Sequence, residues 1–130
     1  MYGRPRPMDR TMRDKDDKDR DDNGPALSDL AFHILLALGD GPAHGYAIGK
    51  DVEEQSGGRL DPTTGALYQA LRRLTDEGLI APADGPADAD VRRKYFVLTR
   101  QGRRATANEA KRLDGLLRAA RQRKLYPQRA

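Results

Sequence analysis

The 130-residue sequence contains no cysteine and no tryptophan. The absence of cysteine excludes disulfides, thiolate zinc sites and cysteine nucleophiles. Long apolar runs are also missing, because the most apolar stretch, residues 30–38, is interrupted by His33 and is far shorter than the ~20 residues that span a bilayer. The first residues lack the apolar segment of a signal peptide. We therefore expect a cytoplasmic, nucleoid-associated protein without membrane contact.

The motifs of the common enzyme classes are missing as well. The sequence has no nucleophile elbow, no glycine motif that cradles phosphate, and no Asp–Glu pair in an apolar setting. A metal site needs several convergent ligands, and nothing at helical spacing supplies them around His33 or His44. We expect both histidines to be structural, and the protein to be no enzyme and to use no cofactor or metal.

Charge is abundant and slightly basic. Lys and Arg outnumber Asp and Glu by 24 to 20, which indicates a polyanionic partner. Residues 1–24 are a separate zone in which the positive and negative charges cancel. The net positive charge therefore belongs to the rest of the chain. We interpret this zone as a disordered charged tail, either a solvated spacer or an arm that touches DNA through Arg4, Arg6 and Arg10.

Apolar spacing and capping residues predict three helices in the first part of the chain. The first runs from a Ser28 cap through residue 38, and the second covers 45–55 and closes at Gly57 and Gly58. The third begins with Asp61 or Thr63 as cap and Pro62 in its first turn, and it ends before Gly78. Its buried stripe consists of Leu67, Ala70, Leu71 and Leu74.

A hairpin and a last helix follow. Residues 79–81 and 92–98 read as strands around a turn at 83–90, so that Arg92 and Lys94 would share one face of the second strand. Thr99 can cap a helix that extends towards Arg123, with Gly115 as a weak point. Its apolar stripe consists of Ala110, Leu113, Leu117 and Ala120.

This order of elements is that of a winged helix-turn-helix. The predicted fold class is mainly α (α+β): three helices, a two-stranded wing and a C-terminal dimerisation helix. We expect a DNA-binding domain over 25–98 and the dimerisation helix over 99–125. A helix fits the major groove of double-stranded DNA, where each base pair displays its own pattern of donors and acceptors.

The polar face of the third helix and the wing carry the candidate DNA contacts. These are Lys50, Thr63, Thr64, Gly65, Tyr68, Gln69, Arg72, Arg73, Arg92, Arg93 and Lys94. Capping alone also explains the two threonines, and Gly65 serves either a close approach to DNA or the packing of helices. Tyr46 is expected in the core. The alternative function is a protein-interaction module without DNA binding.

Several stretches together resemble the PadR family of bacterial transcription regulators. They are residues 30–38 (LAFHILLAL), 44–48 (HGYAI), 65–74 (GALYQALRRL), 77–80 (EGLI) and 92–99 (RRKYFVLT), followed by Gly102. The resemblance covers roughly residues 27–102. The recognition-helix tyrosine of the family falls on Tyr68, its second-helix tyrosine on Tyr46, and its basic wing pair on Arg92 and Arg93.

The resemblance implies a homodimer that represses nearby genes and is relieved by a small-molecule effector or another signal. The expected dimer interface is Leu113, Leu116, Leu117 and Ala120, and the expected effector pocket is lined by Phe32, Leu36 and Leu116. The sequence departs from the family where Gln69 replaces a frequent proline and where the region after Gly102 is short. The absence of tryptophan leaves the aromatic sandwich of multidrug-binding relatives without a counterpart.

Overall fold

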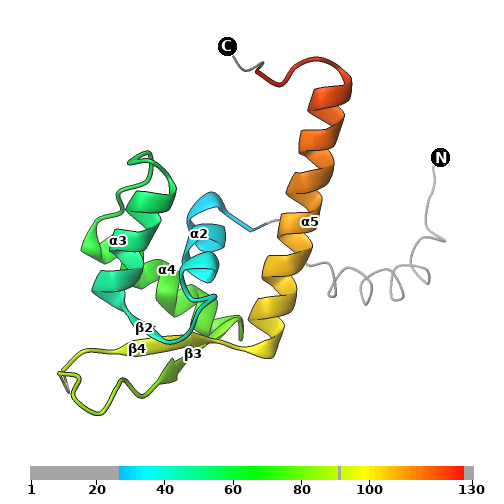
Figure 1. Ribbon diagram of the computed structural model, residues 1–130. Helices are drawn as coiled ribbons and strands as arrows, with labels where there is room; N and C mark the ends of the chain where they lie inside the picture. The colour runs from blue at the N-terminus through cyan, green and yellow to red at the C-terminus, as the bar shows by residue number, and fades with distance from the viewer. Residues whose placement is uncertain (1–26, 91, 128–130) are drawn as a thin grey trace, which may run out of the picture.

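The computed structural model describes residues 27–90 and 92–127, in which it contains four helices and three strands (Figure 1). In chain order these are α2 (Asp29–Ala37), β2 (Ala43–His44), α3 (Gly45–Gln55), α4 (Thr64–Asp76), β3 (Ile80–Ala83), β4 (Tyr95–Leu98) and α5 (Arg100–Gln122). Helices α2 to α4 cluster on one side of the small sheet, while the C-terminal part of α5 extends beyond the other helices (Figure 1). The predicted tail, 1–24, lies outside the described residues.

Side-chain caps fix where the helices begin. The Ser28 hydroxyl accepts the Ala31 N–H at 3.1 Å, and the Thr99 hydroxyl accepts the Gly102 N–H at 2.9 Å, as predicted. At α4 the cap is Thr63, whose hydroxyl accepts the Ala66 N–H at 3.1 Å. The expectation that Pro62 occupies the first turn is wrong, because Pro62 precedes the cap. Each such cap contributes about 1 kcal/mol.

The sequence also indicates where the helices end. Gly78 has a φ of +80°, which turns the chain sharply out of α4, and the Leu79 N–H then donates to the Leu74 carbonyl at 3.0 Å. Strand β3 follows at once. Helix α5 continues through Gly115 without interruption, so the expected weak point does not break it.

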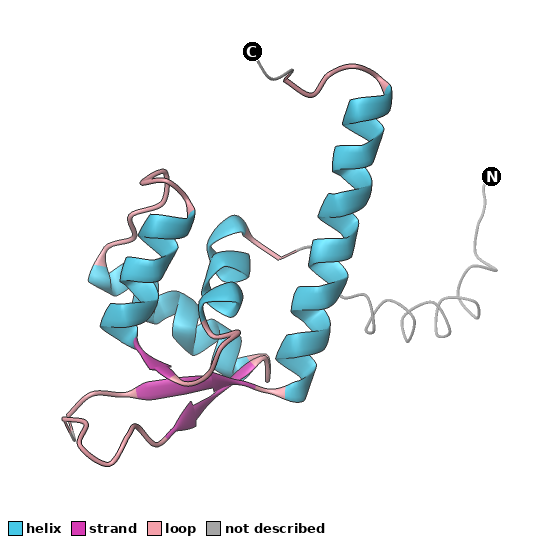
Figure 2. Ribbon diagram, in the orientation of Figure 1, coloured by secondary structure: helices cyan, strands magenta, loops and turns pink. Residues whose placement is uncertain are grey.

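The sheet has three antiparallel strands in the order β2-β4-β3 (Figure 2). The hairpin pairs Ile80 with Leu98 and Ala83 with Tyr95, and the missed strand β2 adds His44 opposite Tyr95. Because β4 begins only at Tyr95, the basic residues before it lie in the loop rather than in the strand. The expectation that they alternate between strand faces is therefore wrong.

The core lies between α2, α3, α4 and the sheet. Its buried apolar side chains are Ile34, Leu35, Leu38, Ile48, Val52, Leu67, Leu71, Leu74, Leu79, Ile80 and Phe96. Fully burying one such side chain stabilises the fold by about 1.5–3 kcal/mol. None of these residues belongs to α5, whose Ala105 packs against this core as a partly buried side chain.

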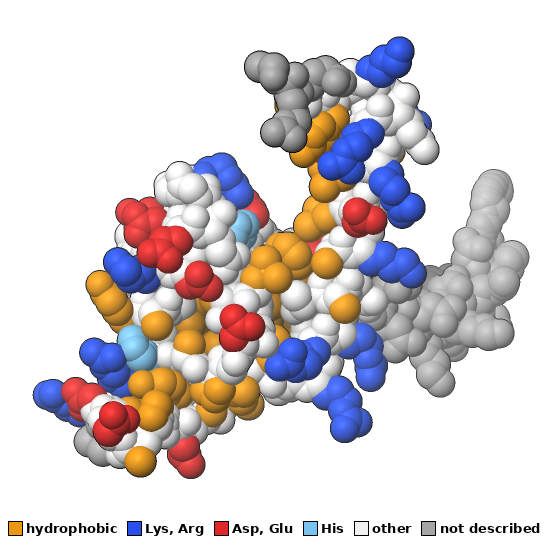
Figure 3. All heavy atoms as spheres, viewed as in Figure 1, with side chains coloured by type: hydrophobic (Ala, Val, Ile, Leu, Met, Phe, Trp, Pro, Cys, Tyr) orange, Lys and Arg blue, Asp and Glu red, His pale blue; other side chains and the backbone are white. Residues whose placement is uncertain are grey.

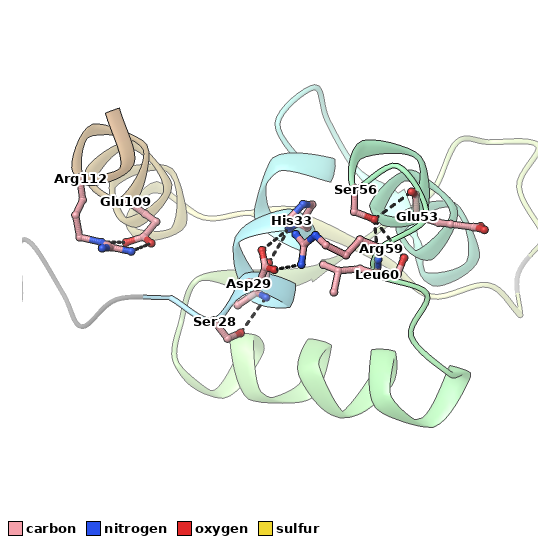
Figure 4. A network of polar contacts seen from close by, with 10 residues as sticks. Ser28, Asp29, His33, Glu53, Ser56, Arg59, Leu60, Glu109 and Arg112 are labelled. Atoms are coloured by element: carbon pink, nitrogen blue, oxygen red, sulfur yellow. Dashed lines mark hydrogen bonds and ion pairs between the residues drawn. The ribbon is translucent and has the colours of Figure 1, made fainter. Parts of the chain in front are cut away.

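Helix α5 attaches through its N-terminal half. Gly102 packs so closely on β3 that a Cβ there would overlap the Leu79 carbonyl oxygen. Glu109 is buried, receives a backbone hydrogen bond from Leu27, and is held by two hydrogen bonds from Arg112 (Figure 4). The hydrogen bonds from Arg112 hold the pKa of Glu109 below its usual value, despite the burial that raises it.

Within residues 27–90 and 92–127, the C-terminal half of α5 has no comparable attachment. Leu116 is 55% exposed and Leu117 is 43% exposed. Figure 3 shows hydrophobic side chains gathered on the side of α5 that faces the other helices, with Lys and Arg mainly on its outer side. No helix among the described residues is long and apolar enough to cross a membrane.

Candidate nucleic-acid interface

Helix α4 has one buried face and one face open to solvent. Leu67, Leu71 and Leu74 are buried in the core and anchor the helix. The exposed face carries Thr64, Gly65, Tyr68, Gln69, Arg72 and Arg73. All the α4 candidates are therefore exposed, as the spacing of the leucines predicts.

Gly65 is open on this face. A Cβ built on Gly65 would have no atom of the described residues within 4 Å. The interpretation that Gly65 lets two helices pack within the chain is therefore wrong. A glycine in a helix is about 1 kcal/mol less favourable than alanine, so this helix carries a destabilising residue that no internal contact explains.

Tyr68 separates two hollows on the surface. The first, which we call the wing cleft, has a volume of about 430 Å³ and is lined by His44, Gly45, Tyr46, Tyr68, Arg92, Arg93 and Lys94. The second, the helix cleft, has a volume of about 310 Å³ between α3 and α4, and Tyr46, Lys50, Thr64 and Tyr68 contribute to its lining. The structure thus joins the wing candidates to Tyr68, and Lys50 to Thr64.

The helix-turn-helix formed by α3 and α4 positions both Tyr46 and Tyr68. Tyr68 lies against the α3 backbone so closely that a Cβ on Gly45 would overlap its hydroxyl. Tyr46 is 72% exposed, so the expectation that it belongs to the core is wrong. The inward side of the short α3 is occupied by Ile48 and Val52, which leaves Tyr46 on the surface.

The three basic residues of the wing differ in their partners. Arg92 makes two side-chain hydrogen bonds to Asp90, at 3.1 and 3.2 Å, and these lower the pKa of that carboxyl. Arg93 places its Nη1 atom 2.8 Å from Nε2 of His44. Lys94 is exposed in the loop directly before β4. The charge of Arg92 is therefore compensated locally, whereas Arg93 meets an imidazole rather than a carboxylate.

Gln69 and Arg73 lie on another side of α4. Together with residues of α2 they line a third hollow of about 430 Å³, whose lining also includes Leu27, Leu30 and Ala70. This hollow shares no lining residue with the wing cleft. The candidates of the third helix therefore point in different directions around its exposed face.

His44 is the residue that the sequence prediction missed. We expected a structural histidine, and it does cap α3 by accepting the Ala47 N–H at Nδ1 over 3.3 Å. It also lines the wing cleft and contacts Arg93. The available signal was its place at the start of the HGYAI stretch, directly before Gly45 and Tyr46.

The dimer and effector residues stay predictions, because a single chain does not test them. Leu113 and Ala120 are half-buried, while Leu116 and Leu117 are exposed. In the expected effector pocket, Phe32 is half-buried and Leu36 is 44% exposed.

Three helices over a small antiparallel sheet, with a basic loop beside the exposed face of the third, define a winged-helix transcription regulator. The chain belongs to the PadR-like family of transcriptional regulators, whose family model matches residues 34–108. This agrees with the expectation that the protein is not an enzyme.

Known proteins with similar sequences and structures support this assignment. Over 83 residues the chain is 42% identical to a 37.1 kDa protein in transposon Tn4556 of Streptomyces fradiae; this match covers 64% of the chain and only 22% of that relative. A PadR family transcription regulator from Clostridium difficile has the same fold, with a TM-score of 0.63 at 23% identity over 73% of this chain and 97% of that one. Bacillus subtilis PadR in complex with operator DNA is 28% identical, with a TM-score of 0.53 over 61% of this chain and 45% of that one.

Proposed function

We propose that this protein binds double-stranded DNA sequence-specifically, as a homodimer on a roughly palindromic operator, and represses transcription there. The observation that carries the proposal is the wing cleft beside the exposed face of α4. Among the described residues that line this cleft three are basic and none is acidic. Such a surface favours the phosphate backbone of DNA.

The exposed face of α4 supplies the sequence-reading part of the proposal. Gly65 leaves space for the close approach of a DNA backbone or base edge, and Tyr68 and Arg72 project from the same exposed face. Gln69 has the amide that matches the major-groove edge of adenine. The related Bacillus subtilis PadR, which forms a complex with operator DNA, supports this use of the fold.

Homodimerisation would explain the exposed apolar half of α5. A helix of 23 residues that buries only Gly102 and Glu109 in its own chain leaves its leucines for another surface. A twofold dimer would place two copies of α4 in successive major grooves, about 34–36 Å apart. Binding of a small molecule between α2 and α5, beside Phe32, Leu36 and Leu116, would change that spacing and relieve repression.

The first test is a fluorescence-anisotropy titration with the DNA upstream of the protein's own gene, against a scrambled duplex, at two salt concentrations. We expect specific binding that weakens steeply with salt. Arg72→Ala should weaken binding and reduce the salt slope by about one unit, as for a lost phosphate contact. Arg118→Ala, an exposed arginine paired with Asp114 on α5, is the matched control and should leave both unchanged.

Two outcomes would contradict the proposal. If neither duplex binds at low salt, the surface does not serve DNA. If the chain instead captures a partner protein with little dependence on salt, it is a protein-interaction module.

A further inference from the structure

His44 connects the helix-turn-helix to the wing. It is the last residue of β2, it caps α3, and its ring lies beside the wing loop. Its Nδ1 atom faces the Ala47 N–H at 3.3 Å, and its Nε2 atom faces the Nη1 atom of Arg93 at 2.8 Å. Both neighbours are hydrogen-bond donors, and an arginine side chain has no acceptor.

A neutral imidazole cannot satisfy both of these donors. One of its nitrogens carries hydrogen and donates, so only the other can accept. If Nε2 is bare, it accepts from Arg93 and the Ala47 N–H loses its cap. If Nδ1 is bare, it caps α3 and the Nε2–H group faces the guanidinium of Arg93. The two contacts therefore compete for one lone pair.

The surroundings of the ring allow the proton to change place while the ring stays. Tyr95 packs edge-on against His44 with a centroid separation of 5.3 Å, and Tyr46 stacks nearly parallel to it at 6.4 Å. The backbone of His44 is also paired with Tyr95 in the sheet. The ring thus lies between β4 and α3, and its tautomer decides from which of the two donors it accepts.

We propose that His44 is a positioning residue for DNA binding: it holds Arg93 in the free protein, releases it to a DNA phosphate, and then caps α3 through Nδ1. The inference rests on the proposed function and adds a coupling between the wing and the helix-turn-helix. A phosphate is a stronger partner for a guanidinium than a neutral imidazole, because the hydrogen bonds are charge-assisted. The Ala47 N–H gains its cap in the same step, so contact of the wing with DNA stabilises the start of α3.

The same arrangement predicts a dependence on pH. The groups that face the ring are Arg93 and the other wing cations Arg92 and Lys94, together with Tyr46, Tyr68 and Tyr95, and none of these is a carboxylate. Burial and the charge of Arg93 lower the pKa of His44 in the free protein. Capping through Nδ1 needs a bare nitrogen, so the gain that DNA contact brings to the start of α3 exists only while the ring is neutral and is lost as the pH falls through the pKa of His44.

The direct test is ¹⁵N NMR of the imidazole nitrogens in the full-length protein, with and without operator duplex. We expect Nε2 to be bare in the free protein. In Arg93→Ala without DNA, and in the wild-type protein with DNA, we expect Nε2 to carry hydrogen. An unchanged ring state in both cases would overturn the inference. If only the DNA-free comparison shows the change, the contact exists without a role in DNA binding, and the inference fails at that step.

The second test is the operator affinity between pH 5.5 and 7.5 for the wild-type protein, His44→Asn and His33→Asn. Asparagine is a good helix cap that does not titrate, so His44→Asn should fold and should lose about threefold to tenfold of the pH-dependent gain in affinity. His33 bonds to Asp29 on α2, far from the wing in the chain, and its variant should keep the wild-type profile. Identical profiles for all three proteins would overturn the inference while leaving the proposed function intact. The absence of any DNA binding by the wild-type protein would contradict both.

Discussion

At Gly65, the residue that would best stabilise α4 differs from the residue that the proposed DNA contact needs. It is exposed on the helix surface, and no atom of the described residues would contact a side chain placed there. Within the free protein alanine would therefore be the better residue. A surface that must approach a DNA backbone closely explains the glycine, since a methyl group would separate the two surfaces.

Gly65→Ala should accordingly have opposite effects on stability and binding. We expect the free energy of unfolding to rise by about 0.5–1 kcal/mol in urea denaturation, because alanine favours the helix. We expect operator affinity to fall by about tenfold in anisotropy titrations. Gly115→Ala is the control, because a Cβ at Gly115 also meets no described atom within 4 Å, so the substitution should stabilise α5 without changing the exposed face of α4. Equal operator affinity for Gly65→Ala and the wild-type protein would contradict the close approach.

A second prediction for a single residue concerns Glu109 and the stability of the fold at low pH. Hydrogen bonds from Arg112 lower its pKa in the folded protein, so its stabilising contribution is complete above the unfolded value of about 4.5 and is lost as the pH falls through the folded value. Glu109→Gln keeps an acceptor for Leu27 but removes the charge.

We expect Glu109→Gln to lose roughly 1 kcal/mol of unfolding free energy at pH 7. We also expect a flatter decline of stability between pH 5 and 3, measured by urea denaturation at each pH. Asp29 and Asp90 also have lowered pKa values, so part of the decline should remain. A decline as steep as that of the wild-type protein would show that Glu109 does not contribute to it.

Among the elements, the helices and the β3–β4 hairpin could be predicted from the sequence, whereas strand β2 could not. The second helix was placed at 45–55, as observed, and Thr99 was recognised as the cap of α5, because apolar spacing and capping hydroxyls are local signals. Strand β2 has only two residues, too few for an alternating pattern. Its existence depends on pairing with β4, which is distant in sequence.

The candidate interface, too, could be predicted only in part from the sequence. The exposed face of α4 follows from the spacing of its leucines, so Tyr68 and Arg72 could be placed on it from the sequence. The contact between His44 and Arg93 joins residues 49 apart, and the exposure of Tyr46 depends on which side of α3 the core takes. Only the folded chain shows which cation of the wing is paired with a carboxylate and which contacts the His44 ring.

A prediction about a whole secondary-structure element concerns helix α5. Leu116→Asp together with Leu117→Asp should dissociate the dimer, because it puts charge into the proposed apolar interface. We expect the dimer dissociation constant, measured by sedimentation equilibrium, to rise by more than about 100-fold, with the core of each chain intact by circular dichroism. Arg118→Ala, on the same helix, should remain dimeric. A wild-type protein that is monomeric at micromolar concentration would contradict the interface.

At the scale of the whole molecule, the two proposed surfaces lie on different elements. The wing cleft and the exposed face of α4 would face DNA, while the C-terminal half of α5 would face a second copy of the chain. The buried Glu109 connects α5 to Leu27, which lies just before α2.

The measurement that tests the central claim most directly is a map of backbone amide chemical-shift changes on addition of operator duplex. The account predicts the largest changes at residues 64–73 of α4, at 92–94 of the wing and around the start of α3, all of which should diminish at high salt. Small changes at α5 are expected from any adjustment of the dimer. Changes confined to α5, or none at α4 and the wing with bound DNA present, would contradict the proposed interface.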